Sequence, residues 1–259
     1  MNTQAYAVVT GASRGLGKAL AIELARRRIN TILISSSEKV IDFCQSLADD
    51  YPIDAHYFIT DLTNRDAIIA TAQKINERFN VFMLINNSGV GGSKRFEEVE
   101  TAYLEKIIHL NIIGTTLLTK LLINNLLKQK ESYILNVASM AALTPTAYKT
   151  IYPASKSFVY SFSLGLHEEY KKRGMHVSVV CPGAMATSPE ICARIEKQGF
   201  FGKLTLVPIE KIARKCIRGL LHQRREIIVT PFSWLFSKII PNCIKVPILS
   251  KIVRKETAG

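Results

Sequence analysis

The chain has 259 residues, 47% of them apolar, which is enough to bury the core of one large α/β domain. This composition excludes an intrinsically disordered chain. The formal net charge of +13 leaves nucleic acid, anionic lipid, an acidic carrier protein and simple solubility as explanations. Neither a nucleic-acid-binding motif nor interleaved basic and aromatic residues accompany the charge, so we predict no nucleic-acid partner.

The cysteines and the first residues favour a reducing compartment. Five cysteines are scattered without C-x-x-C spacing, at Cys44, Cys181, Cys192, Cys216 and Cys243. An odd number without paired spacing predicts free thiols, with neither a disulfide framework nor a metal site. The first apolar run, residues 5–9, has the length of a strand and leads into a glycine turn, so it does not fit a secretory signal peptide. We therefore expect a cytoplasmic protein.

A strand, a glycine-rich turn and a helix open the chain. Residues 6–10 form a short continuous apolar run, typical of a strand buried on both faces. Gly11-Ala-Ser-Arg-Gly15-Leu-Gly17 follows, and a helical pattern continues to residue 28. Such a unit places backbone N–H groups and a helix N-terminus against a pyrophosphate. The spacing G-x-x-x-G-x-G differs from the common G-x-G-x-x-G, and a tight turn without a ligand is the alternative.

The end of the second strand indicates which dinucleotide is preferred. Residues 31–35 read as this strand, whose end in NAD-binding proteins carries an acid for the ribose 2′-hydroxyl. Here the strand ends in three serines, including Ser36, and no acid stands at its tip. Arg14 in the glycine turn, and less certainly Lys39, could instead meet a 2′-phosphate. We therefore predict NADP(H) over NAD(H), with a solvated Arg14 as the alternative.

Two more strands and a long helix follow. Residues 55–60 form the third strand, which ends at Asp61 and Leu62, and residues 81–85 form the fourth, which runs into Asn86-Asn87-Ser88-Gly89. A helical pattern spans residues 103–127 and contains Asn111 among apolar neighbours. An unpaired buried amide costs about 1–3 kcal/mol, so Asn111 needs a partner. Whether that partner belongs to a functional site or only to the core stays open.

The second half of the chain completes the alternation of strands and helices. Residues 133–137 form the fifth strand, with Ser139 just beyond its carboxyl end, where open parallel sheets bind ligands. After a helix come a sixth strand at 176–180, a helix at 208–221 and a seventh strand at 226–229. We predict an α/β fold: one doubly wound Rossmann-type domain, residues 1–230, with a mostly parallel seven-stranded sheet and helices on both faces. Residues 231–259 form a basic and apolar extension.

Tyr152 and Lys156 carry the chemical hypothesis. They are four residues apart, so on a helix they share one face. A free phenol with a pKa near ~10 is a poor acid or base at neutral pH, and an adjacent ammonium favours the phenolate. A shift of ~2–3 units corresponds to ~3–4 kcal/mol, which one partly desolvated lysine could largely supply. A surface tyrosine beside a solvated lysine is the alternative for such a pair taken alone.

Six motifs in order give a family resemblance: Thr10-Gly-Ala-Ser-Arg-Gly-Leu-Gly17, Asn86-Asn-Ser-Gly89, Asn111, Ser139, Tyr152-x-x-x-Lys156 and Pro182-Gly-x-x-x-Thr187. Over roughly residues 5–230 the chain resembles the classical short-chain dehydrogenase/reductase family. The resemblance implies that Tyr152 gives a proton to the carbonyl oxygen while hydride arrives from the nicotinamide. It also implies that Lys156 lowers the tyrosine pKa and binds the nicotinamide ribose, Ser139 steadies the substrate oxygen and Asn111 holds a water in a proton relay.

The resemblance also implies a set of cofactor-binding residues. They are Gly11, Ser13, Arg14, Gly15, Leu16, Gly17, Ser36, Asp61, Leu62, Asn87, Gly89, Tyr152, Lys156, Pro182, Gly183 and Thr187. Two departures from the family pattern are Ser88, where an alanine is usual, and Met140-Ala141-Ala142 after the serine. Neither departure removes a reacting group, so we expect an NADP(H)-dependent oxidoreductase acting on a ketone or secondary alcohol.

The C-terminal extension bears on the substrate. From residue 231 it is apolar and basic, and Lys238, Pro241, Lys245 and Pro247 interrupt it before the ~18–20 apolar residues of a membrane span. It could dock on its own domain or on a second subunit, rest on a membrane surface through residues 231–255, or cover a greasy substrate. We expect a lipid-like carbonyl substrate of the 3-oxoacyl or 3-ketosphinganine type and a homodimer or homotetramer. A steroid or other alcohol dehydrogenase and a non-catalytic NADP(H)-binding regulator are the alternatives.

Overall fold

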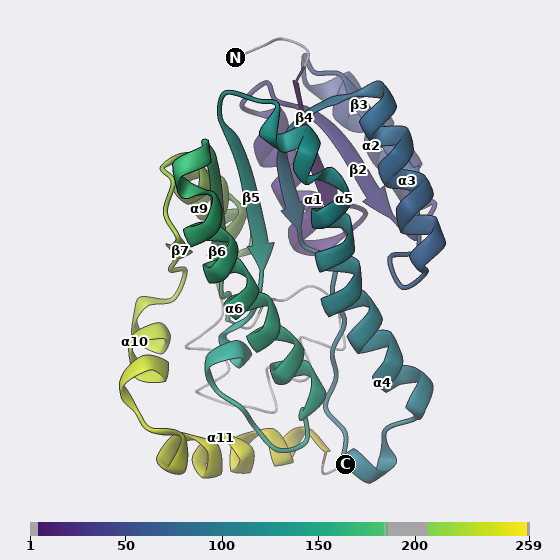
Figure 1. Ribbon diagram of the computed structural model, residues 1–259. Coiled ribbons are helices and arrows are strands. Elements are labelled where there is room, and N and C mark those ends of the chain that lie inside the picture. The colour runs from purple at the N-terminus through teal and green to yellow at the C-terminus, as the bar shows by residue number, and fades with distance from the viewer. Residues whose placement is uncertain (1–4, 184, 186–206, 258–259) are drawn as a thin grey trace.

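A parallel sheet of seven strands forms the centre of the molecule (Figure 1). The computed structural model describes residues 5–183, 185 and 207–257. The spatial order of the strands is β3-β2-β1-β4-β5-β6-β7, and every pairing is parallel. The strands are β1 (Ala5–Thr10), β2 (Asn30–Ser35), β3 (Ala55–Ile59), β4 (Asn80–Asn86), β5 (Ser132–Val137), β6 (Met175–Val180) and β7 (Glu226–Ile227). The predicted seven-stranded Rossmann-type fold is confirmed.

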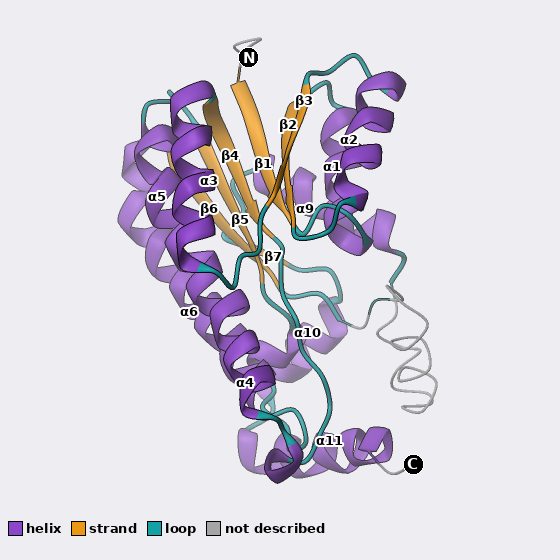
Figure 2. Cartoon of the chain, turned by 90° about the vertical axis from the view of Figure 1, so that its right-hand side faces the viewer, coloured by secondary structure: helices purple, strands orange, loops and turns teal. Residues whose placement is uncertain are grey.

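Helices cover both faces of the sheet, and Figure 2 shows the sheet nearly edge-on between them. One face packs against α1 (Gly15–Ala25), α2 (Lys39–Asp50) and α9 (Ile209–Leu221). The other face packs against α3 (Arg65–Arg78), α5 (Thr115–Leu127) and α6 (Ile151–Tyr170). The central strands read as continuous apolar runs because both of their faces are buried.

The direction in which the strands follow one another reverses between β1 and β4. From β1 the chain moves outward through β2 and β3, and then returns to the other side of β1 with β4. Val8 of β1 is aligned with Ile32 of β2 and with Leu84 of β4. Ligands of open α/β sheets bind at such a switch point, because the loops diverge there and leave space.

The predicted long helix contains an irregular turn. The chain is helical from α4 (Thr101–Ile108) through α5, but His109–Gly114 between them forms a π-helix around Asn111. Short π-helical turns often occur at functional sites. Of the helices that the structure describes, the continuous stretch Thr101–Leu127 is long and apolar enough to cross a membrane, judged by length and composition alone. Leu118, Leu122 and Leu126 of this stretch are fully buried in the domain core, so we interpret it as a core helix.

The C-terminal extension forms two further helices, α10 (Pro231–Ile239) and α11 (Asn242–Thr257), the second with Pro247 inside it. Both lie in the lower half of Figures 1 and 2, beyond the carboxyl ends of the strands, with α11 at the foot. The seventh strand is shorter than predicted: β7 ends at Ile227, whereas the sequence pattern continues to Val229. The boundary proposed at residue 230 falls directly before α10.

Candidate active site

Lys156 is held inside the molecule at the end of β5. Its side chain is buried, and Nζ donates a hydrogen bond of 2.8 Å to the carbonyl oxygen of Val137, the last residue of that strand. The Nζ atom also lies against Gly89, because a Cβ atom on that glycine would be 3.0 Å away. Burial lowers the pKa of the Lys156 ammonium to about 8. Desolvation therefore disfavours the charged form of this buried amine.

Tyr152 lies one helical turn before Lys156 on α6, next to Ser139. Its ring packs against Gly91, where an added Cβ atom would come within 2.2 Å of it. Burial raises the pKa of the Tyr152 phenol, while a hydrogen bond with the Ser139 side chain acts in the opposite direction. Burial has the largest effect on this pKa, and the expected lowering by Lys156 stays a prediction.

Ser139 is positioned by the short 3-10 helix that it begins. Its backbone is extended, and its Oγ accepts a hydrogen bond of 3.2 Å from the Ala141 N–H as the N-cap of Met140–Leu143. The next residue, Met140, donates its N–H to the Pro182 carbonyl at 3.0 Å. The segment after β5 is thus attached to the segment after β6, and Pro182 and Gly183 stand beside Ser139.

Asn111 has the partners that its burial requires. Its amide nitrogen donates to the Val90 carbonyl at 3.0 Å and to Ser155 Oγ at 2.9 Å, and its oxygen accepts from the Val90 N–H at 2.9 Å. The side chain therefore joins the loop after β4 to α6, the helix that carries Tyr152 and Lys156. Both amide hydrogens are used by protein atoms, so the side chain acts as a bridge between two segments.

The glycine turn forms a close-packed cradle at the carboxyl end of β1. Gly11 and Gly15 have positive φ values, 65° and 55°. A Cβ atom on Gly17 would lie 2.2 Å from the Gly11 carbonyl oxygen and 2.6 Å from the Asn87 amide nitrogen. The Asn87 amide in turn donates to the Thr10 carbonyl at 2.9 Å, which ties the loop after β4 to the turn. The turn and the Tyr152 region are thus neighbours through residues 87–91.

This cradle fits a dinucleotide phosphate. No side chain caps the N-terminus of α1, where Arg14 is the N-cap residue, and the first turn contains no acidic residue. The positive end of the helix dipole and its free N–H groups are therefore left for an anion. Leu16 is buried beneath the turn, and Arg14 is exposed above it.

The tip of β2 supplies hydroxyl groups next to the turn. Ser35 Oγ donates to Ser13 Oγ at 2.9 Å and accepts from the Ser37 N–H at 3.1 Å, while Ser36 is exposed. The end of β3 lies beside this tip, since the Thr60 N–H donates to the Ser35 carbonyl at 2.8 Å.

Asp61 and Leu62 follow β3. Asp61 accepts hydrogen bonds from the backbone and side chain of Thr63, at 2.9 and 2.8 Å, while Leu62 is buried against Gly114. Thr187, also predicted to contact the cofactor, lies outside the described residues.

The sequence did not predict several residues of this site, because they contribute backbone atoms or the space left by a missing side chain. Val137 and Val90 contribute carbonyl groups, which no residue type reveals. Gly91 provides the space for the Tyr152 ring, and the glycine pair that it forms with Gly92 was an available signal. Thr10 opens the glycine motif but was given no role of its own, and its Oγ1 accepts from the N–H groups of Asn87 and Ser88.

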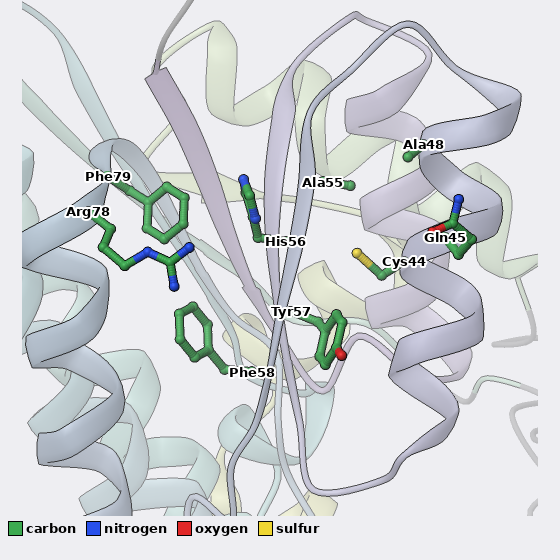
Figure 3. A pocket seen from close by; sticks show the side chains of 9 residues that line it. All are labelled: Cys44, Gln45, Ala48, Ala55, His56, Tyr57, Phe58, Arg78 and Phe79. Atoms are coloured by element: carbon green, nitrogen blue, oxygen red, sulfur yellow. The ribbon is translucent and has the colours of Figure 1, made fainter.

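A separate hollow lies at the outer edge of the sheet, around β3 (Figure 3). Its volume is about 240 Å³, and side chains from α2, β3 and the end of α3 line it. The Cys44 thiol points toward it, but burial raises the pKa of that thiol to about 11. The part of the chain that the structure describes also contains no group of three His, Cys, Asp or Glu residues that could hold a metal ion. The candidate catalytic and cofactor-binding residues described above lie near the carboxyl ends of β1, β4 and β5.

Comparison with known proteins agrees with this geometry. A family model described as short chain dehydrogenase matches residues 5–196. A very-long-chain 3-oxoacyl-CoA reductase from Anas platyrhynchos is 34% identical over 253 residues, covering 95% of this chain and 79% of the relative. A short-chain dehydrogenase from Sphingobium yanoikuyae, solved in complex with NADPH, is 26% identical with a TM-score of 0.77, covering 86% of this chain and 87% of that one.

A more distant structure shares the fold. The 3-ketoacyl-(acyl-carrier-protein) reductase from Brucella melitensis, solved in complex with NADH, has a TM-score of 0.74 at 22% identity, covering 86% of this chain and 96% of that one. The fold and the matched relatives define an NAD(P)-dependent oxidoreductase with a Rossmann-type domain. The chain belongs to the short-chain dehydrogenase/reductase family.

Proposed function

We propose that this protein is an NADP(H)-dependent reductase of a hydrophobic, lipid-like carbonyl, of the 3-oxoacyl or 3-ketosphinganine type. The main support for the proposal is the hydrogen bond between the Tyr152 and Ser139 side chains, next to the glycine cradle. The very-long-chain 3-oxoacyl-CoA reductase similarity supports the substrate class. The apolar helices α10 and α11 beside the site support it too.

In this proposal Tyr152 gives a proton to the carbonyl oxygen of the substrate. The phenol is protonated at neutral pH, which is the form that a proton donor needs. The bound nicotinamide cofactor supplies the hydride. Ser139, already hydrogen-bonded to the phenol, would turn the same hydroxyl toward the substrate oxygen and hold it in line with Tyr152.

Lys156 and Asn111 position the reacting groups. The Lys156 ammonium is fixed between β5 and Gly89, at the edge of the cradle where the nicotinamide half of a dinucleotide would lie. Two further hydrogens of that ammonium are available to a ribose hydroxyl. Asn111 keeps α6 at a fixed distance from the loop after β4, so that the Tyr152 ring stays seated on Gly91.

The preference for NADP(H) rests on charge at the adenosine end of the cradle. Arg14 is exposed at the start of α1, and the serines at the tip of β2 offer hydroxyl groups without a carboxylate. A 2′-phosphate would gain charge-assisted hydrogen bonds there, and a free 2′-hydroxyl would gain few. Replacing Arg14 with Ala is expected to weaken NADPH binding about tenfold and to leave NADH binding within about twofold.

A panel of ketones tests the substrate class. We expect kcat/KM with NADPH to rise with acyl chain length across a series of 3-oxoacyl thioesters, because each added methylene buries more apolar surface. NADH serves as the matched comparison for each substrate. Equal rates with short and long chains would contradict the lipid proposal. A clear preference for a steroid ketone would support the alternative, a steroid or other alcohol dehydrogenase.

A further inference from the structure

The outer face of α10 carries a stripe of large apolar side chains. Phe232, Leu235, Phe236 and Ile239 occupy positions i, i+3, i+4 and i+7, so they share one side of the helix. Each is between 36% and 73% exposed, whereas Ser237 on the opposite side is buried. A surface helix of a soluble domain usually buries its apolar side. Here the small polar residue faces the protein and the large apolar residues face outward.

The first half of α11 extends the same surface. Ile244 and Ile248, one turn apart, are about half exposed. Lys245 between them faces inward and donates a hydrogen bond to the Ser237 carbonyl, and burial lowers the pKa of its ammonium. The buried lysine therefore fixes α11 against α10 and leaves the two isoleucines outside. Half of the exposed large apolar side chains that the structure describes belong to these two helices.

Contacts with the domain hold the two helices in place. Lys238 Nζ donates to the Tyr160 hydroxyl at 2.5 Å, and the same hydroxyl donates to Glu226 at 2.5 Å. In α11, Ser250 Oγ accepts a hydrogen bond of 2.9 Å from the Ala147 N–H, which belongs to the segment between Ser139 and Tyr152. The apolar stripe is thus a fixed feature of the surface, beside the segment that carries the candidate active site (Figure 1).

The charge of residues 231–254 indicates what kind of partner binds the apolar stripe. Residues 231–254 contain four basic residues and no acidic one. Lys251 and Arg254 are exposed on α11. A second copy of the chain placed on the stripe would bring like charges together without a carboxylate from either segment. A bilayer with anionic headgroups fits both the apolar stripe and the positive charge. The apolar side chains would enter the boundary of the acyl chains, and the basic side chains would contact the headgroups.

We propose that α10 and the first half of α11 form a membrane-docking surface for an anionic bilayer, with Phe232, Leu235, Phe236, Ile239, Ile244 and Ile248 as the inserting side chains. The surface lies beside the segment that joins Ser139 to Tyr152, so a lipid substrate could move between the bilayer and the site without crossing water. The inference concerns binding and does not depend on the identity of the substrate.

Vesicle co-sedimentation of the full chain tests the proposal. We expect the protein to bind phosphatidylcholine vesicles that contain phosphatidylserine about tenfold more strongly than vesicles of phosphatidylcholine alone. The double variant Phe232→Ser/Ile239→Ser is expected to lose at least about tenfold in affinity for the anionic vesicles. The matched control is Ile41→Ser/Ile59→Ser, which removes two exposed isoleucines far from α10 and should bind like the parent chain.

Two further readouts keep the result interpretable. Melting temperature and reduction of a short, soluble ketone should be unchanged in both double variants, which shows that they fold. Analytical ultracentrifugation without lipid reports self-association. Unaltered vesicle binding by Phe232→Ser/Ile239→Ser would overturn the proposal. So would loss of a dimer in that variant combined with no binding of the parent chain to either vesicle.

Discussion

At the scale of single residues, the candidate site contains a buried ammonium, that of Lys156. It is hydrogen-bonded to one backbone carbonyl, and burial lowers its pKa from 10.5 to about 8. Tyr152 beside it has a raised pKa, also because of burial. The two groups therefore stand as a neutral phenol and an easily discharged amine. At neutral pH the phenol carries the proton that the proposed reaction transfers.

The lowered pKa of Lys156 predicts how stability depends on pH. The unfolded chain binds one more proton than the native chain between pH values of about 8 and 10.5, so this lysine makes the free energy of unfolding rise with pH in that window. The full difference corresponds to about 3 kcal/mol. Denaturant unfolding of the parent chain and of Lys156→Met, at several pH values across that window, measures it. The parent should gain stability relative to the variant as the pH rises, and parallel curves would contradict the assignment.

Asn111 should matter for stability as well as for activity. Replacing it with Ala leaves the Val90 N–H, the Val90 carbonyl and the Ser155 hydroxyl without their partner inside the protein. Buried groups that lose a partner cost about 1–3 kcal/mol each, partly recovered by Ser155, which also bonds to the Tyr152 carbonyl. We expect the free energy of unfolding to fall by about 2–4 kcal/mol in urea titration. A loss below about 1 kcal/mol would mean that the bridge is dispensable.

At the scale of elements, the glycine turn between β1 and α1 shows how closely two backbone segments approach. Gly17→Ala would place a Cβ atom 2.2 Å from the Gly11 carbonyl oxygen, and backbone atoms cannot move aside cheaply. We expect this variant to lose at least about a hundredfold in NADPH affinity, measured by fluorescence titration, because the cradle must open.

Gly165 on α6 is the control for this prediction. An added Cβ atom there meets nothing within 4 Å, and the position is exposed. Gly165→Ala should therefore bind NADPH like the parent and gain about 0.5–1 kcal/mol of stability from helix propensity. Equal NADPH affinity in the Gly17 and Gly165 variants would contradict the prediction that the glycine turn binds the cofactor.

The anchor of α10 is a second test at this scale. Lys238 contacts the Tyr160 hydroxyl and stands 3.7 Å from Glu226, and its Nζ lies 4.8 Å from the centre of the Tyr160 ring. Tyr160 shares its helix face with Tyr152 and Lys156. Lys238→Ala should release α10, which hydrogen exchange would report as faster exchange confined to α10 and α11. Lys251→Ala, at an exposed position without these contacts, is the control. Slow exchange of α10 in both variants would show that other contacts hold the helix.

At the scale of the whole molecule, the sequence predicted the order of strands and helices well. It predicted the contacts between particular residues less well. Alternating apolar runs and helical patterns predicted the sheet and its layers because both faces of each central strand are buried. The same patterns could not show that the Val137 carbonyl would bind the Lys156 ammonium, since any residue there has a carbonyl. They also could not predict which face of α10 would turn outward. That orientation depends on Tyr160 and Glu226, which are distant in sequence.

The sequence patterns did not predict the irregular parts of the fold, for similar physical reasons. The π-helical turn at Asn111 depends on the bonds that this side chain makes to Val90 and Ser155, and its apolar neighbours alone suggest a regular helix. The ladder between β6 and β7 stops at Ile227 although the apolar pattern continues, and Val229 packs in the core without pairing in the sheet. Asn111 needing a partner was predictable, but the identity of the partner required the tertiary structure.

The central claim is that the Tyr152 phenol supplies the proton in carbonyl reduction. The most direct measurement compares Tyr152→Phe with the parent chain in two assays: turnover of a long-chain 3-oxoacyl thioester with NADPH, and equilibrium binding of NADPH. We expect a loss of about 10²–10⁴-fold in kcat with NADPH affinity kept within about threefold, because the ring and its contact with Gly91 remain. Turnover by Tyr152→Phe within about tenfold of the parent, or no turnover by the parent despite NADPH binding, would contradict it.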